Sequence, residues 1–319
     1  MDDKIYSECL HYWLNSNGNQ PFWTELAKKY KYPSAESLRS SFKRERKRRG
    51  DAKVGTEPVQ LNNNFPTVAV MDIETLPMIG MMWNLYNVDF YPEQVLEDTC
   101  FLSWAGKYLY NDTMYSDILT PEEAKTRNPA RITHSAFEFM KQADIIIGHN
   151  FKAYDGKTLN NNLLMYAKPL KYRVIDTLEI AKNNFRFASN KLAFINKKLG
   201  IREKVTNEGF MLWRNCSEGD SVALSVMLEY NCGDILSTEE LFWKVQPYMT
   251  NMPNFSIYNE NKISPSCTCG SIDISREEKD WYTNSARYEK FRCNTCGALM
   301  RGKKNLLVKE EREQLLVRL

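Results

Sequence analysis

Apolar residues follow two spacings along the middle of the 319-residue chain. Short continuous apolar runs rich in β-branched residues predict strands buried on both faces, and apolar residues recurring every three or four positions predict helices. The expected strands are 67–73, 101–109, 112–118, 144–148 and 172–176. The expected helices lie near 132–142, 155–166, 189–199 and 220–246, broken by local turns. Strands that come first and then alternate with helices predict a mixed α/β sheet.

The N-terminal pattern predicts a compact unit of three helices, at 5–14, 22–30 and 35 to about 48, with Ser34 as the N-cap of the last. A short turn before the last helix resembles a helix-turn-helix module. That helix ends in FKRERKRRG, which is typical of phosphate contact, although a solvated basic helix end complementing the helix dipole is the alternative. Its candidate nucleic-acid-binding residues are Arg39, Lys43, Arg44, Arg46 and Lys47.

Stretches rich in helix and strand breakers divide the chain into modules. The expected units are a basic helical module at 1–50, a linker at 51–66, a large α/β domain at 67–250, a second linker at 251–264, a cysteine module at 265–304 and a tail at 305–319, which predicts a short amphipathic helix.

Charge is unevenly distributed along these modules, although the net charge is only +3. Residues 1–66 carry 12 basic and 8 acidic side chains, residues 67–264 carry 20 and 24, and residues 265–304 carry 8 and 5. Basic flanking modules that bind a polyanion, around acids that hold cations, would produce this division, and so would ordinary solvated surface.

The sequence contains no apolar run of about 20 residues and no basic-then-apolar leader, so we expect a cytoplasmic protein with no membrane partner. Two close cysteine pairs and four single cysteines favour a reducing compartment with a metal site over a disulfide framework.

Four carboxylates lie where the pattern predicts burial. Asp72 and Glu74 end the apolar strand in VAVMDIETLP, Asp155 follows a buried strand, and Asp234 takes an apolar position of a helix four residues after Tyr230. Strand-end, helix-cap or surface positions are the alternative for each acid taken alone. Together, buried like charges need compensation, and oxygen ligands of this kind suit Mg²⁺ or Mn²⁺.

These motifs resemble the DEDD superfamily of 3′–5′ exonucleases, which have a ribonuclease-H-like fold. MDIET (71–75) looks like the first exonuclease motif, and GHNFKAYD (148–155) resembles the second as found near family-B DNA polymerase proofreading domains. YNCGD (230–234) matches Tyr-x-x-x-Asp of the third motif. The resemblance is strongest for phage-encoded stand-alone exonucleases with a C-terminal zinc ribbon. It spans most of 67–304 and includes MWNLYN (82–87), FLSWAGKYL (101–109) and DTLEIAK (176–182).

The resemblance implies a role for each acid. Asp72, Glu74, Asp155 and Asp234 would hold two Mg²⁺ or Mn²⁺ ions about 4 Å apart, which clamp the attacking and leaving oxygens. The third motif occurs with tyrosine or histidine, and no histidine lies near Asp234 in sequence, so Tyr230 would orient the attacking water. Hydrolysis of terminal phosphodiesters would release nucleoside 5′-monophosphates. If the chain is phage-encoded, its compartment would be the bacterial host cytoplasm.

Residues beside the motifs have less specific roles. Asn150 is a candidate for nucleic-acid contact, and His149 and Asn150 are expected to orient their loop rather than bind metal. Asp176 is either a helix cap or a support for the acids. Trp83 and Trp104 could stack on bases, although core packing is the commoner use of a lone tryptophan.

Two tight cysteine pairs about twenty residues apart predict a tetrahedral Zn²⁺ site in a small ribbon. Its ligands would be Cys267, Cys269, Cys293 and Cys296, with C-x-C in the first pair where a zinc ribbon usually has C-x-x-C. Basic residues mixed with aromatics fit binding of single strands, with Arg287, Lys290 and Arg292 as candidates. A purely structural ribbon docked on the α/β domain is the alternative.

The leading hypothesis is therefore a metal-dependent 3′–5′ exonuclease that degrades single-stranded nucleic acid, DNA in preference to RNA, with replication or repair proteins as candidate partners. One alternative is a DNA-binding recruitment or regulatory protein whose nuclease domain is inactive. A second is a structure-selective endonuclease of related fold.

Overall fold

The central body is built on a five-stranded mixed sheet in the order β5-β4-β1-β6-β7. The computed structural model describes residues 2, 4–6, 9, 26–49, 65–84, 91–201, 209–258 and 265–316. The strands of the sheet are β1 (Val68–Leu76), β4 (Cys100–Tyr108), β5 (Tyr115–Ile118), β6 (Ile145–Gly148) and β7 (Arg173–Asp176). All five strands expected from the apolar runs are present, and the third is shorter than expected.

Strand β1 lies at the centre of this sheet. It pairs antiparallel with β4 and parallel with β6, and β6 in turn pairs parallel with β7. The pairing with β6 covers Val68 to Val70, so the edge of β1 beyond Val70 is not covered by that strand. On the β4 side the register shifts between Glu74 and Thr75, a bulge of the kind often found next to functional sites.

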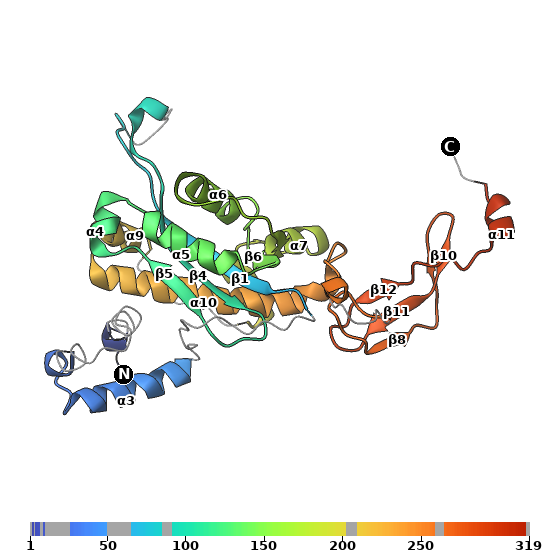
Figure 1. The fold of residues 1–319 in the computed structure, drawn as a ribbon, viewed down its shortest axis with the longest axis horizontal. Helices are drawn as coiled ribbons and strands as arrows, with labels where there is room; N and C mark the ends of the chain where they lie inside the picture. Colours follow the sequence, from blue (N-terminus) through green and yellow to red (C-terminus); the bar gives the residue numbers. More distant parts are fainter. Residues whose placement is uncertain are drawn as a thin grey trace.

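Helices cover both faces of the sheet (Figure 1). Alternation along β1 sends Ala69, Met71 and Ile73 into one core cluster, and Val68 and Val70 into another. The helices are α4 (Pro121–Thr126), α5 (Ala130–Met140), α6 (Asp155–Tyr166), α7 (Thr177–Asn184), α8 (Leu192–Leu199), α9 (Phe210–Ser217) and α10 (Ser221–Val245). The first core contains buried residues of α5 and α6, and the second contains residues of α7, α8 and the C-terminal half of α10.

Three of these helices lie where no helix was expected. Helix α4 begins with a capping box, in which Thr120 and Glu123 exchange backbone and side-chain hydrogen bonds. Helix α7 begins at the cap Asp176, and α9 follows Gly209, whose φ is +66°. Each has eight residues or fewer, so its hydrophobic period is too short to stand out in the sequence.

A narrow arm, described at residues 77–84 and 91–98, projects from the body between β1 and β4 (Figure 1). It contains β2 (Ile79–Gly80), the short helix η1 (Pro92–Gln94) and β3 (Val95–Glu97). Arg127 fixes its base, because one guanidinium nitrogen donates to the Pro77 oxygen at 2.6 Å and to the Asp98 oxygen at 2.7 Å. The sequence pattern did not predict this hairpin, since its strands have only two and three residues.

The described part of the N-terminal module has its own small core. Helix α3 (Ala35–Arg49) matches the third expected helix. Leu38 and Phe42 on α3 pack with Tyr6, Cys9 and Leu26. Most of the first expected helix and the first residues of the second lie outside the described residues, so the helix-turn-helix assignment stays a prediction.

The cysteine module is a separate small sheet joined to the body through residues 251–258. Met252 and Phe255, in the segment expected to be a linker, are buried in the second core cluster. The elements that follow α10 are η2 (Gln246–Tyr248), η3 (Phe255–Tyr258), β8 (Ile274–Arg276), β9 (Trp281–Tyr282), β10 (Arg287–Tyr288), β11 (Lys290–Cys293), β12 (Leu299–Arg301) and α11 (Lys309–Glu313). Strands β8, β11 and β12 form one sheet and β9 pairs with β10. Across the described residues, no helix has both the length and the apolar character that crossing a bilayer requires.

Candidate active site and zinc centre

Asp72 and Glu74 project from β1 toward the side of the sheet on which Val68 and Val70 are buried. Side chains two residues apart share a face of a strand, so both carboxylates point in the same direction. Both are half-buried, in contrast to the fully buried residues that precede them. The central strand therefore presents two acids from a rigid backbone.

Helix α10 provides the third acid. Asp220 caps its N-terminus by accepting from Val222 and Ala223, and the helix then continues unbroken to Val245. Asp234 is only 4% exposed. Its carboxylate, with those of Asp72 and Glu74, forms an acid triad in which one oxygen of each residue lies within 4.8 Å of the others.

Asp155 lies beside the triad but is not part of that group of oxygens. As the first residue of α6, it accepts a hydrogen bond of 3.2 Å from the backbone N–H of Ile73, between the two acids of β1. This N–H lies beyond the section of β1 that pairs with β6. The loop from β6 to α6 thus places a fourth carboxylate, 5% exposed, against the backbone of β1.

Burial is the main cause of an altered acidity at Asp155. Its pKa is raised to about 7, mainly by desolvation and also by the nearby carboxylate of Asp176, against hydrogen bonds from the backbone that lower the pKa. A carboxylate in this setting gains from a neighbouring cation. The donor set of the site is made of carboxylate oxygens, which fits Mg²⁺ or Mn²⁺.

Two polar residues that the sequence reasoning missed fix the orientation of Asp72. Asn231 on α10 is fully buried, and its side-chain N–H donates to Asp72 Oδ2 at 2.7 Å. The Asn231 oxygen accepts from the hydroxyl of Ser103 at 3.2 Å. Ser103 is opposite Glu74 in the β1–β4 register. The only sequence signal was a buried amide within YNCGD, next to Tyr230.

Tyr230 is one turn before Asp234 on α10 and is half-buried. Its ring packs edge-on against Trp213 of α9, with centroids 6.1 Å apart. Near the C-terminal end of β1, the hydroxyls of Tyr154 and Thr75 are 2.7 Å apart. Tyr154 immediately precedes Asp155 and is 46% exposed. Aromatic residues thus lie next to the acids on two different elements.

The β6–α6 loop is held by buried hydrogen bonds. Asp176 accepts from the backbone N–H groups of Asn150 and Lys152, and from Leu178 as the cap of α7, so it both caps a helix and supports the loop. Asn150 has a left-handed backbone, with φ of +67°. The His149 ring nitrogens lie 2.9 Å from the Thr177 hydroxyl and 2.9 Å from the Asn190 oxygen, which fits an orienting role.

The two tryptophans considered as base-stacking residues have opposite surroundings. Trp104 is buried, packs on Phe139 and donates to the Ser135 hydroxyl at 2.9 Å, which fits the core role. Trp83 on the arm is 98% exposed. A core role is therefore wrong for Trp83.

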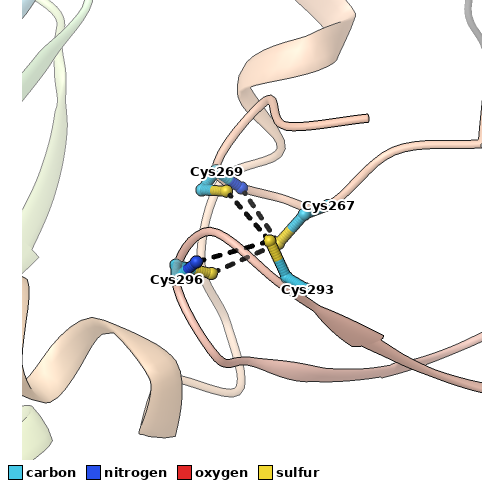
Figure 2. Close-up of side chains that lie close together, drawn as sticks. All are labelled: Cys267, Cys269, Cys293 and Cys296. Atoms are coloured by element: carbon cyan, nitrogen blue, oxygen red, sulfur yellow. Dashed lines mark hydrogen bonds between the residues drawn. The ribbon is translucent and has the colours of Figure 1, made fainter. Parts of the chain in front are cut away.

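The cysteine cluster, Cys267, Cys269, Cys293 and Cys296, converges as the spacing predicted (Figure 2). The Cys267 and Cys296 sulfurs are 3.6 Å apart, and those of Cys269 and Cys293 are 3.8 Å apart. A tetrahedron with Zn–S bonds near 2.3 Å has edges of about 3.8 Å. The hydrogen bond between the Cys267 and Cys269 thiols lowers the pKa of Cys267 and raises the pKa of Cys269. The thiols therefore need a cation to ionise together. The cluster is consistent with a zinc ribbon.

The short C-x-C pair forms a knuckle similar to that of the C-x-x-C pair. The Cys269 N–H points at the Cys267 sulfur at 3.5 Å, and the Cys296 N–H points at the Cys293 sulfur at the same distance. Each knuckle is followed by a glycine with positive φ, Gly270 at +91° and Gly297 at +81°.

The first knuckle is also attached to the body. The Phe255 N–H donates to the Thr268 oxygen at 2.8 Å, and the Ser266 and Ser256 hydroxyls are 2.7 Å apart. Tyr110, at the β4–β5 turn, packs at a tilt against Trp243, with ring centroids 5.7 Å apart, and Cys269 packs against the second core cluster. The ribbon therefore docks on the α/β domain.

The basic candidates are placed unevenly. In α3, Arg44 is exposed and donates to the Ser41 hydroxyl, whereas the side chains of Arg39, Lys43, Arg46 and Lys47 lie outside the described residues. In the ribbon, the three candidates all pair with acids. Arg287 contacts Asp280 at 2.5 Å, and Arg292 and Lys290 contact Glu277 at 2.7 and 3.8 Å.

Comparison with family models matches the α/β domain from within β4 to the end of α10. Residues 105–246 match the RNase_H_2 family model of the RNase_H superfamily. The fold is ribonuclease-H-like. A solved structure, the family B DNA polymerase from the hyperthermophilic archaeon Pyrobaculum calidifontis, is similar over 61% of this chain and 26% of that chain, with 16% identity and a TM-score of 0.41. The chain thus spans about a quarter of that polymerase. No curated protein matches the sequence significantly.

Proposed function

We propose that the chain is a metal-dependent 3′–5′ exonuclease that hydrolyses terminal phosphodiesters of single-stranded nucleic acid, DNA in preference to RNA, to nucleoside 5′-monophosphates. The observation that carries the proposal is the acid triad. Its three carboxylates come from a central strand and a long helix of a ribonuclease-H-like fold and reach within 4.8 Å of one another. Like charges brought together in this way favour bound divalent cations.

Asp72, Glu74 and Asp234 would hold one cation, and Asp155, hydrogen-bonded to the backbone between Asp72 and Glu74, would help hold a second. Bound cations would neutralise the carboxylates and the scissile phosphate and would lower the pKa of a water molecule. Asn231 donates an N–H group to Asp72 Oδ2 and so fixes the orientation of that carboxylate for metal binding. Tyr230, braced by Trp213, would position the attacking water.

Product analysis tests the proposal directly. The full chain is incubated with 5′-labelled DNA and RNA oligonucleotides, single-stranded and double-stranded, with Mg²⁺ or Mn²⁺. We expect a ladder shortened from the 3′ end and free nucleoside 5′-monophosphates from single-stranded DNA. A covalently closed single-stranded circle is the matched substrate, because it has no 3′ end.

Two results would contradict the proposal. Cleavage of the circle at a rate similar to that of the linear strand would indicate an endonuclease. Binding of the linear strand with no mononucleotide product, under either metal, would indicate an inactive recruitment or regulatory protein.

A further inference from the structure

The basic side chains of the ribbon fall into two groups, according to whether a carboxylate lies at ion-pair distance. Asp280 contacts both Arg276 and Arg287, and Glu277 contacts Lys290 and Arg292. An arginine or lysine already paired with a carboxylate adds little charge for a phosphate. The residues predicted from sequence to bind nucleic acid, Arg287, Lys290 and Arg292, are all in this paired group.

Four exposed basic residues of the described ribbon form the other group, Lys279 between β8 and β9 and three more at the end of β12. Arg301, Lys303 and Lys304 are exposed, and within the described ribbon no carboxylate lies at ion-pair distance from any of them. They follow one another at the end of β12, so their positive charge is concentrated at one place in the ribbon.

Aromatic side chains lie beside this charge. The guanidinium of Arg301 lies over the ring of Tyr288, 4.1 Å from the centroid. Tyr288 is directly opposite Trp281 in the β9–β10 pair, and opposed residues of a strand pair project from the same face. Trp281 is 48% exposed. Trp281, Tyr288 and Arg301 therefore form a continuous stripe of planar groups on one face.

We propose that this stripe binds single-stranded nucleic acid, with bases stacking on Trp281 and on the Arg301–Tyr288 pair and phosphates contacting Arg301, Lys303 and Lys304. Aromatic side chains beside unpaired positive charge bind single strands better than duplexes. The bases of a single strand can unstack and then stack on the protein. The stripe would be a substrate-binding surface of the nuclease proposed above. Its biological role rests on that proposed function, whereas its binding of single strands does not.

The test measures binding in the absence of hydrolysis. The full chain, loaded with zinc and carrying Asp234→Asn, is titrated against a fluorescein-labelled 20-nucleotide single-stranded DNA and the matched duplex. Trp281→Ala should weaken single-strand binding about tenfold. Arg301→Ala should weaken it severalfold and reduce the slope of log affinity against log salt by about one. Duplex binding should change less.

Matched controls come from the same module. Tyr282→Ala removes an aromatic residue that is 64% exposed and projects from the opposite face of the β9–β10 pair. Arg312→Ala removes the same charge as Arg301→Ala from the exposed helix α11. Both should keep the parent affinity within about twofold. Zinc content per chain, measured on every variant, verifies that the ribbon is intact.

The possible outcomes separate this inference from the proposed function. If zinc-loaded Trp281→Ala and Arg301→Ala bind the single strand as tightly as the parent, or if Tyr282→Ala loses as much affinity as Trp281→Ala, the stripe is not the binding surface. If the stripe variants lose affinity but the parent chain with Asp234 intact degrades no substrate, the stripe stands and the exonuclease proposal fails.

Discussion

The acid triad and the cysteine cluster both gather side chains that repel one another when ionised, but they draw them from very different lengths of chain. The triad joins residue 72 on β1 to residue 234 on α10, and its scaffold is the core of the sheet. The cysteines come from two knuckles within residues 267–296, which lie in a small sheet and are held to the body only through residues 255–256 at the first knuckle. The triad should therefore keep its shape without metal, whereas the ribbon should depend on its metal.

Removal of a zinc ligand should give the largest effect. The free energy of binding a structural zinc is on the order of 10 kcal/mol, so Cys293→Ser should lose the metal and the order of β8, β11 and β12. Hydrogen exchange is expected to accelerate across 267–301 and to stay slow in β1. Zinc assay provides the second readout. Cys100→Ser, which changes a buried cysteine outside the cluster, should keep about one zinc per chain.

If β1 lost its protection together with the ribbon, the two regions would form one cooperative unit. The contrast between a metal-dependent ribbon and a metal-independent core would then be wrong.

Truncation of the triad should abolish activity and leave the fold intact. Asp72→Ala or Asp234→Ala removes a ligand of cations that contribute several kcal/mol to transition-state stabilisation, so nuclease activity should fall about 10³-fold or more. The thermal unfolding midpoint should not fall, because each variant removes mutual repulsion. The control is Asp112→Ala, at an exposed turn position. If either triad variant were as active as the control, the assignment of Asp72 and Asp234 as metal ligands would be wrong.

Asn231→Ala tests whether the triad needs an oriented Asp72. The amide fixes one carboxylate oxygen, and loss of such a supporting group commonly reduces metal affinity or activity about 10- to 100-fold. Activity measured against Mg²⁺ concentration should show a higher metal requirement, partly restored at high Mg²⁺. As the control, Asn162→Ala alters another buried amide, 6% exposed, which lies on α6 and donates to the Thr158 oxygen of its own helix. An unchanged metal requirement in Asn231→Ala would contradict the orienting role.

Asp155→Asn should give the smallest effect, an increase in stability. Its folded-state pKa is raised to about 7, from an ordinary value of 3.8, so the folded chain resists ionisation of this group. This group therefore favours folding at low pH, and its contribution is lost as pH rises from about 4 through 7. In Mg²⁺-free solution at pH 8 the variant should gain on the order of 1 kcal/mol, because asparagine carries no charge.

The measurement is denaturant unfolding at pH 8 and pH 5, with Asp112→Asn as the exposed control. The gain should shrink toward pH 5, where Asp155 is protonated in the folded chain. A gain of equal size at both values of pH would mean that charge burial is not its cause.

The apolar runs were sufficient to locate the five strands of the central sheet, because strands buried on both faces have a composition that few other elements share. They were not sufficient for α4, α7, α9 or the arm, which are too short to show a period. Trp83 illustrates the limit. A large aromatic side chain of this kind is usually buried in a core, yet Trp83 is 98% exposed, because it lies on the arm that projects from the body.

The sequence alone determined which residues are unusual: Asp72, Glu74 and Asp234 as acids in apolar settings, and four cysteines whose spacing carries the zinc prediction. Neighbouring residues are sufficient to recognise them, because an acid within an apolar run and two cysteines close in sequence are both local features. Only the tertiary structure decided that Asn231 orients Asp72, that Asp155 stands apart from the triad, and that the unpaired charge of the ribbon is at Arg301 rather than at Arg287. Those facts depend on which side chains contact one another across different helices and strands. A single sequence does not reveal such long-range contacts.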